Sequence, residues 1–373
     1  MTSRSLPDFP WDTIADAKRR ASEHPDGLIN LSIGTPVDPT PQVLQDALRE
    51  ASDAPGYPQV YGTPDLREAV SAWFARRRNA SSVDPDGVLP LVGSKELIAW
   101  LPTLLNLGPG DLVGYPHLAY PTYDVGVRLA GAKGFPQASL LQFGPTSPKL
   151  LWINTPANPH GQVLGLGHLQ KVVAWARDRG VIVASDECYA ELDWRDDPEG
   201  ITTPSILDDR VCGGSHEGLL AVYSLSKQSN LAGYRAGFAA GDVDLVRQLL
   251  EVRKHAGMMM PWPVQRALIA GVTDDEHVAA QKQIYAARRT VLRDAMVAAG
   301  WQIDYSDAGL YLWASQGSPC RASVDDLAQI GILVAPGDFY GSAGSQHVRV
   351  ALTATDDQIR TAAARITARW AQA

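Results

Sequence analysis

Several features are scarce in this sequence, and each absence narrows the class of protein. The 373 residues contain three cysteines, Cys188, Cys212 and Cys320, whose wide spacing matches neither a disulfide framework nor a zinc site. The longest apolar run, 97–107, is interrupted by a proline and an asparagine and is too short to cross a bilayer. The first eleven residues lack the basic region and apolar core of a signal peptide. We therefore expect a cytoplasmic protein with reduced thiols and no membrane partner.

An excess of positive charge is also missing. The chain has 33 Lys and Arg against 41 Asp and Glu, which gives a net charge of −8. Without a basic cluster to offset it, this charge argues against a nucleic-acid partner. The eight histidines form no ligand-spaced cluster, so we expect no metal site. The composition, 45% hydrophobic and 20% charged, is that of a globular protein large enough for two domains.

Strand and helix patterns alternate through the middle of the chain. Continuous apolar strands joined by helical crossovers predict an α/β fold with a parallel sheet covered on both faces. The expected strands are 88–92, 112–115, 149–154, 181–185, 219–223 and 235–240, with helices that include 96–107, 166–179 and 243–255.

The pattern changes from Pro263 onward, where helices and short strands predict a second, α+β domain. We expect a large domain at 40–262 and a smaller one built from 1–39 and 263–373, with the first residues as an arm. Phe9 and Trp11 on this arm need a surface to pack on, in the same chain or in a neighbour. The expected elements are helices 263–272, 276–299 and 356–371 and strands 310–314, 332–335 and 348–351.

Polar side chains follow several of these strands, where α/β proteins bind their ligands. Lys227 comes after strand 219–223 in a Ser-x-Ser-Lys sequence. In a pocket its pKa would fall, and the neutral amine could form a Schiff base. Taken alone, such a lysine is more often a solvated loop residue. Ser94 and Lys95 follow a glycine and open a helix, which suits a phosphate, although Ser94 could simply cap the helix.

Five further residues each have a functional and a structural reading. Asp186 could pair with a ring nitrogen, and Tyr189 could reach a ring hydroxyl, or the acid could merely cap a helix. Tyr120 could stack on a flat ring or only pack, and Asn158 could contact a ligand or form an Asx-turn. Arg349 lies in an apolar strand and needs an anionic partner, either a ligand carboxylate or a structural acid.

Taken in order, these pieces resemble the fold-type I pyridoxal phosphate (PLP) aminotransferases of the aspartate aminotransferase superfamily. The motifs are N-T-P-A-N-P-H-G at 154–161, D-x-x-Y at 186–189, S-x-S-K at 224–227, the glycine-flanked Arg235 and Arg349. The resemblance covers the chain from about residue 31 to the end. It implies a large domain with a mostly parallel sheet sandwiched by helices, a smaller α+β domain, and transfer of an amino group to a keto acid.

The resemblance also implies roles for individual residues. Lys227 would hold PLP covalently and move the substrate proton, and Asp186 would pair with the pyridinium nitrogen. Tyr189 and Asn158 would contact the ring oxygen, and Tyr120 would stack on the ring. The residues implied for the phosphate are Ser94, Lys95, Ser224, Ser226 and Arg235.

On the same resemblance, Arg349 would bind the substrate α-carboxylate together with Asn158 and the Gly34 backbone. Tyr61 would reach the phosphate in the neighbouring subunit, which implies a homodimer with shared sites.

Four segments, 9–13, 34–39, 55–58 and 93–102, look like the N-succinyldiaminopimelate aminotransferases of bacterial lysine synthesis. This likeness implies glutamate (giving 2-oxoglutarate) as the donor and N-succinyl-2-amino-6-oxopimelate as the acceptor. The distal carboxylates would need cations, for which Arg253 and Lys254 are candidates. Departures at Thr155, at His160 and at 307–311, where relatives have a double glycine and an aromatic residue, concern specificity rather than the chemical step.

Other functions remain open within and beyond this fold. The same cofactor could serve a C–S β-lyase or an aminotransferase of another specificity. A pyridoxal-sensing domain of a transcription regulator is a third reading, but we expect no residues outside the fold to build its DNA-binding module.

Overall fold

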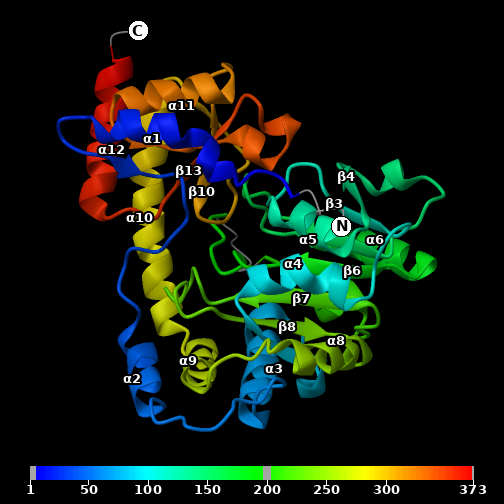
Figure 1. The fold of residues 1–373 in the computed structure, drawn as a ribbon. Helices are drawn as coiled ribbons and strands as arrows, with labels where there is room; N and C mark the ends of the chain where they lie inside the picture. The colour runs from blue at the N-terminus through cyan, green and yellow to red at the C-terminus, as the bar shows by residue number, and fades with distance from the viewer. Residues whose placement is uncertain (1–5, 196–202, 372–373) are drawn as a thin grey trace.

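A seven-stranded sheet forms the centre of the computed structural model, which describes residues 6–195 and 203–371 (Figure 1). The strand order is β2-β8-β7-β6-β5-β3-β4, and only β8 runs antiparallel to its neighbours. The expected mostly parallel α/β sheet is thus confirmed. Its strands are β2 (Val88–Val92), β3 (Leu112–Pro116), β4 (Lys133–Gln137), β5 (Leu150–Asn154), β6 (Ile182–Asp186), β7 (Leu219–Ser224) and β8 (Ala236–Gly241).

Helices cover both faces of this sheet. In β7, Ala221 and Tyr223 join the core on one face, whereas Leu220 and Val222 join the core on the other. Because successive side chains are buried on opposite faces, the central strands are apolar throughout. The helices of this part are α2 (Gln42–Glu50), α3 (Pro64–Arg78), α4 (Ser94–Leu104), α5 (Thr122–Ala130), α6 (Leu166–Arg179), α7 (Asp209–Cys212), α8 (Val243–Ala256) and α9 (Trp262–Thr273).

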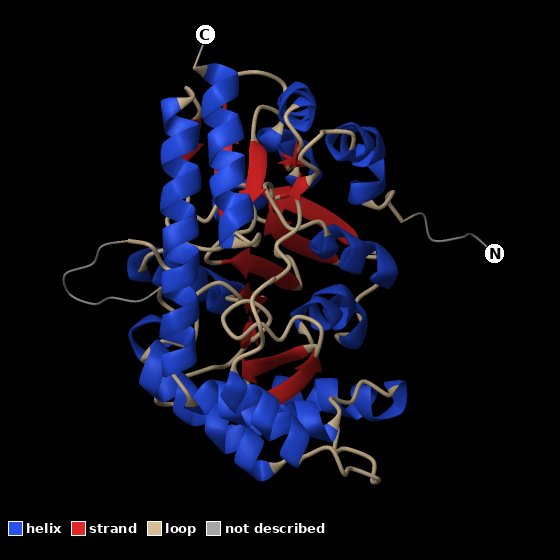
Figure 2. Cartoon of the chain, turned by 90° about the vertical axis from the view of Figure 1, so that its left-hand side faces the viewer, coloured by secondary structure: helices blue, strands red, loops and turns tan. Residues whose placement is uncertain are grey.

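A four-stranded antiparallel sheet, ordered β12-β13-β10-β9, lies in the second part of the molecule. The long helices α10 and α12 lie side by side next to it (Figure 2). The elements are α10 (Glu276–Ala298), α11 (Cys320–Gln329), α12 (Asp356–Trp370), β9 (Gln302–Asp304), β10 (Tyr311–Ser315), β12 (Ala335–Pro336) and β13 (Val348–Ala351).

The N-terminal residues pack on this second part. Helix α1 (Ala15–Ser22) contributes Ala17 and Ala21 to its core, and β1 (Ile29–Asn30) pairs in parallel with β11 (Ile332–Leu333). Trp11 lies against the ring of Phe339, with ring centroids 5.5 Å apart. Short 3-10 helices complete the fold at Pro10–Ile14, Pro85–Gly87, Leu140–Phe143, Gly337–Tyr340 and Ser342–Gly344.

Two differences from the expected elements have local causes. Strand β4 was not expected because its sequence contains Gly134 and Pro136 and its side chains are only partly buried. It is an edge strand, where a proline removes no hydrogen bond that the sheet needs. The single strand expected at 332–335 is divided between β11 and β12, which pair in different sheets. Within the described ranges, none of the helices combines the length and apolarity needed to cross a membrane.

An ion pair between Arg78 and Glu187 is buried where α3 meets the end of β6. Both side chains are almost inaccessible, and the charged atoms lie 3.4 Å apart. Glu187 also accepts hydrogen bonds from the Ser185 hydroxyl and the Ile206 amide, while burial raises the pKa of its carboxyl group. The pair is therefore structural, and each buried charge is compensated by the charge of the other residue.

Replacing Glu187 with alanine should destabilise the protein by about 3–5 kcal/mol, because it leaves the Arg78 guanidinium buried without its counter-charge. The measurement is the free energy of unfolding in urea. Glu251→Ala, which removes the acid of an exposed pair with Lys254, is the control and should change little. Equal stability of the two variants would contradict this account of the pair.

Candidate active site

A cleft of about 230 Å³ lies at the carboxyl ends of β5, β6 and β7 and also receives residues from the second part of the molecule. It brings together all the predicted site residues except Tyr61. The predicted residues that line it are Gly34, Ser94, Lys95, Tyr120, Asn158, Asp186, Tyr189, Ser224, Ser226, Lys227, Arg235 and Arg349. Residues far apart in the sequence therefore meet because the carboxyl ends of neighbouring parallel strands share one edge.

Lys227 lies within this cleft, and its amino group donates a hydrogen bond to the carbonyl oxygen of Gly34. Burial lowers the pKa of Lys227, and the positive charges of Arg349 and Arg235 act in the same direction. A lysine with a lowered pKa carries more neutral amine at physiological pH, which is the nucleophilic form.

Asp186 closes β6 with its carboxylate held on both oxygens. Oδ2 accepts a hydrogen bond of 2.8 Å from the Tyr123 hydroxyl, and Oδ1 accepts one of 3.2 Å from the Cys188 amide. Burial raises the pKa of Asp186, and these bonds oppose the rise. Across residues 6–195 and 203–371, no lysine or arginine forms an ion pair with this acid. Its uncompensated charge fits a cationic ring nitrogen supplied by a ligand.

Tyr123 was missed by the sequence reasoning. It lies on α5, is fully buried, and has a pKa raised well above the usual value, first by burial and then by Asp186. It therefore stays protonated and keeps donating to the carboxylate. No local sequence pattern marks this role, because the contact joins a helix to a strand 63 residues later.

An anion-binding corner lies at the start of α4. Gly93 adopts φ 75° and precedes Ser94, whose amide belongs to the first turn of the helix. A Cβ on Gly93 would come within 2.2 Å of the Arg235 guanidinium, so glycine lets the arginine approach this turn. The Ser224 hydroxyl donates to the Ser226 hydroxyl at 2.7 Å. A helix N-terminus, a guanidinium and two hydroxyls together suit a phosphate.

Arg349 is buried in β13 at the opposite wall of the cleft. Its guanidinium donates to the Asn158 side-chain oxygen at 2.9 Å and to the Ser32 carbonyl oxygen at 2.8 Å. The rings of Tyr311 and Tyr340 cover it, at 3.8 and 5.0 Å from ring centroid to Cζ. The Nε–H group is buried and has no partner among the described residues. A buried arginine with an unused donor fits a ligand carboxylate.

Asn154 fixes the turn that presents Asn158. Its side-chain nitrogen donates to the carbonyl oxygens of Pro156 and Asp186, and its side-chain oxygen accepts from the Asn158 amide at 2.7 Å. This asparagine, also missed as a functional residue, links the strand that carries Asp186 to the turn that contacts Arg349.

Tyr61 lies outside the cleft of its own chain. Its hydroxyl donates to the Asp86 carbonyl oxygen at 2.8 Å, and the Arg67 guanidinium lies 4.1 Å from its ring centroid. Its predicted contact with a neighbouring subunit remains a prediction.

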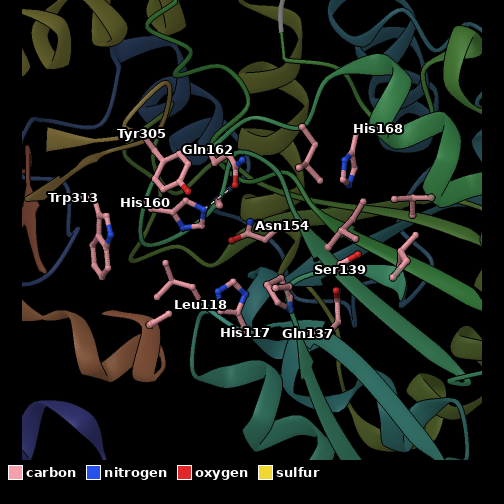
Figure 3. Close-up of a pocket in the computed structure, with 18 of the residues that line it drawn as sticks. His117, Leu118, Gln137, Ser139, Asn154, His160, Gln162, His168, Tyr305 and Trp313 are labelled. Atoms are coloured by element: carbon pink, nitrogen blue, oxygen red, sulfur yellow. Dashed lines mark hydrogen bonds between the residues drawn. The ribbon is translucent and has the colours of Figure 1, made fainter. Parts of the chain in front are cut away.

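A larger cavity of about 990 Å³ lies on the other side of the 154–161 turn (Figure 3). None of the predicted site residues lines it, and it contains His160, which we had expected to influence substrate shape. His160 interacts with Gln162 and meets the Tyr305 ring edge-on. Burial lowers the pKa of His160 to about 4. His160 is thus a neutral side chain outside the cleft, and the expectation that it shapes the substrate site is not supported.

Sequence spacing indicated no cluster of metal ligands, but folding brings Asp209, Cys212 and His216 within 4.8 Å of one another. This group lies on and after α7, away from the cleft. Its carboxylate already accepts hydrogen bonds from Ser81 and Ser82. The hydrogen bonds from these serines stabilise the Asp209 carboxylate, so its position requires no metal ion.

Residues 26–366 match the family model of aminotransferase classes I and II. The chain belongs to this family. Its members use PLP, and the chain is therefore a PLP-dependent aminotransferase, as the resemblance implied. Three features of the cleft fit this cofactor: Asp186, which no described lysine or arginine pairs with, the anion-binding corner, and the lysine of lowered pKa.

Three relatives illustrate the range of this family, and the names of two of them give different substrates. The 4-dedimethylamino-4-oxo-anhydrotetracycline transaminase OxyQ of Streptomyces rimosus is 57% identical, over 98% of this chain and 100% of the relative. The probable aminotransferase Rv1178 of Mycobacterium tuberculosis is 59% identical, over 98% and 86%. An LL-diaminopimelate aminotransferase of Gloeobacter violaceus is 33% identical, over 98% of both chains.

Solved structures agree on the fold. An aminotransferase from Staphylococcus aureus superposes with a TM-score of 0.87 at 26% identity, over 99% of this chain and 98% of the other. A probable N-succinyldiaminopimelate aminotransferase from Thermus thermophilus does so with 0.86 at 29% identity, over 97% and 100%. The family assignment is confirmed, whereas the narrower N-succinyldiaminopimelate assignment is not, since the more similar relatives carry other names.

Replacing Tyr123 with phenylalanine should weaken PLP binding at least about tenfold, because a hydrogen bond to a charged group contributes about 1.5–3 kcal/mol. Losing this donor raises the pKa of Asp186 further, so the defect should be larger at pH 6 than at pH 8. The measurement is an absorbance titration of the apoprotein with PLP. Tyr115→Phe, which loses a bond to Asp124 outside the cleft, is the matched control. Equal affinities in the two variants would contradict the role of Tyr123.

Proposed function

We propose that this aminotransferase takes an amino group from glutamate and passes it to a diaminopimelate-type acceptor, N-succinyl-2-amino-6-oxopimelate. Two similarities support this substrate class: the LL-diaminopimelate aminotransferase at 33% identity and the probable N-succinyldiaminopimelate aminotransferase at 29%. The observation that best supports this reaction is the position of Lys227, a lysine of lowered pKa. It lines the same cleft as the buried Arg349 and as Asp186, with which no lysine or arginine of the described ranges forms an ion pair.

Each predicted residue then has a task that its surroundings support. PLP, when bound, supplies an electron sink for the substrate carbanion. Lys227 attaches the cofactor and later moves the proton, since it is the amine in the cleft with a lowered pKa. Asp186 holds the ring nitrogen, and Arg349 receives the substrate α-carboxylate through its unused Nε–H edge. Tyr189 and Asn158 would contact the ring oxygen, and Tyr120 would stack on the ring.

The two cations suggested for a distal carboxylate do not serve it from within this chain. Arg253 is buried, pairs with Glu96 at 2.6 Å and donates to the Met258 carbonyl oxygen. Lys254 is on the surface and pairs with Glu251. Neither lines the cleft, so this expectation is wrong for the described chain.

Lys95 is a better candidate for the distal carboxylate. It lines the cleft, and its amino group lies 6.0 Å from the centroid of the Tyr120 ring. No acid is paired with it in the described ranges. Because its backbone belongs to the first turn of α4, Lys95 offers an amide to the phosphate and a separate charge to the substrate.

A homodimer is part of this proposal. Tyr61 lies outside the cleft, so any phosphate that it contacts belongs to a neighbouring chain. Nearby Tyr57 is 96% exposed in the single chain, which leaves an aromatic surface for such a neighbour. We also propose a cytoplasmic location, where glutamate and the acceptor occur together.

A second candidate substrate is a bulky ketone like that named for the Streptomyces relative, which the 57% identity favours. A C–S β-lyase activity is the remaining alternative. These possibilities differ in which compounds change the PLP absorbance and in whether pyruvate is released.

A half-reaction screen should separate them. The loaded enzyme is mixed with glutamate, aspartate, an aromatic amino acid, N-succinyl-LL-diaminopimelate or cystathionine, and the PLP band is followed. Glutamate and N-succinyl-LL-diaminopimelate should abolish the band without releasing pyruvate, and Lys227→Ala should show no such exchange. If N-succinyl-LL-diaminopimelate is inert, the proposed substrate is wrong while the aminotransferase assignment stands. Pyruvate and ammonia from cystathionine would indicate the lyase.

Replacing Lys95 with methionine should raise KM for N-succinyl-LL-diaminopimelate about tenfold, equivalent to about 1.4 kcal/mol, with a smaller effect on an aromatic amino acid. Lys254→Met is the matched control because it removes an exposed lysine that does not line the cleft. The check is steady-state kinetics with both substrates. A similar rise in KM for both substrates would instead assign Lys95 to the cofactor.

A further inference from the structure

Tyr311 occupies a place in the cleft that the proposed roles leave unassigned. It begins β10 and lines the cleft. Its ring lies over the Arg349 guanidinium at 3.8 Å, and the Tyr340 ring lies 5.0 Å from the same group. With aromatic rings packed against the guanidinium, a carboxylate has to approach its edge. Stacked arginines keep this in-plane donor geometry.

The hydroxyl groups of these two tyrosines have different surroundings. The Tyr311 hydroxyl lies 3.2 Å from that of Tyr189. It also lies next to Gly34, where an added Cβ would come within 2.2 Å of it. The Tyr340 hydroxyl is buried and has no hydrogen-bond partner among residues 6–195 and 203–371. The two rings therefore contact the same cation, but only one of the hydroxyls belongs to a polar network near Lys227.

We propose that Tyr311 is a positioning residue for transamination: its ring orients Arg349 for the substrate carboxylate, and its hydroxyl, paired with that of Tyr189, sets the protonation of Lys227. The proposal rests on the roles proposed above for Lys227 and Arg349. It adds to those roles a residue that contacts both Arg349 and Tyr189.

The charges around Tyr311 give the direction of its effect. Burial alone would raise the pKa of Tyr311, but Arg349 and Lys227, together with the bond to Tyr189, bring it below the usual value. Burial and then Tyr311 raise the pKa of Tyr189 well above its usual value, so Tyr189 is the harder of the two hydroxyls to ionise. Tyr311 is thus the more easily ionised hydroxyl of the two, with Tyr285 and Tyr340 as further titratable neighbours.

The same charges act on Lys227 in turn. Burial lowers the pKa of Lys227, Tyr311 and Cys188 raise it, and Arg349 and Arg235 lower it. Removing the Tyr311 hydroxyl takes away the largest of the effects that oppose burial. The pKa of Lys227 should therefore fall further, and its amine should become reactive at lower pH.

The test uses apoprotein variants Tyr311→Phe and Tyr340→Phe, which each lose one buried hydroxyl and keep the ring. The rate of PLP attachment is followed by absorbance from pH 5.5 to 9.5. The pH of half-maximal rate should move downward in Tyr311→Phe and stay at the wild-type value in Tyr340→Phe. Equal midpoints in the two variants would overturn the proposal. Lys227→Ala distinguishes a failure of this proposal from a failure of the proposed function. If PLP still attaches to this variant, Lys227 is not the attachment point and the proposed function is refuted.

The role of the ring has its own readout. The Tyr311→Leu variant should have a KM for glutamate at least tenfold above that of the wild type. The Tyr311→Phe variant should have a KM close to the wild-type value, since the phenyl ring alone stacks on Arg349. An equal KM in the leucine and phenylalanine variants would contradict the orienting role. Gly34→Ala should likewise weaken glutamate binding through its collision with the Tyr311 hydroxyl, and adding Tyr311→Phe should recover part of it. Additive defects in the double variant would count against the contact.

Discussion

The buried guanidinium of Arg349 is the constraint on which the cleft depends. A charge inside an apolar strand is costly unless hydrogen bonds and counter-charges compensate it. Here Asn158 and the Ser32 carbonyl oxygen supply the bonds, and the tyrosine rings supply the packing. Asn158 comes from the turn that follows β5, so this one side chain joins the two parts of the molecule. The Nε–H group has no partner in the described ranges and is free to donate to a carboxylate.

The other charges in the cleft are complementary to PLP before it binds. Within the described chain, Arg235 is a cation without an acid partner, Asp186 is an acid without a cation, and Lys227 is an amine of lowered pKa. Their separation into an anion-binding corner at α4 and an acid at β6 matches a molecule with a phosphate at one end and a basic nitrogen at the other. Fixing such groups beforehand reduces the reorganisation that catalysis would otherwise require.

The sequence allowed the parallel sheet to be predicted because its central strands are apolar on both faces, and the site because polar residues follow those strands. The prediction was wrong or incomplete where contacts between residues distant in the sequence determine the structure. The partially exposed edge strand β4 has no apolar pattern, and Arg253 was taken for a possible ligand group although it is buried against Glu96. Tyr123 and Tyr311 were missed because their hydroxyls find partners 63 and 122 residues away, which no local motif records.

Specificity in this family has to come from residues that the shared chemistry does not constrain. A cleft of about 230 Å³ lies below the range of about 300–1,000 Å³ typical of small-molecule sites, and here it has to hold both cofactor and substrate. Lys227, Asp186 and Arg235 lie on the seven-stranded sheet and its adjoining turns. Tyr311 and Arg349 lie on the smaller sheet, so a shift of that sheet changes the space beside Lys227 and the carboxylate contact together.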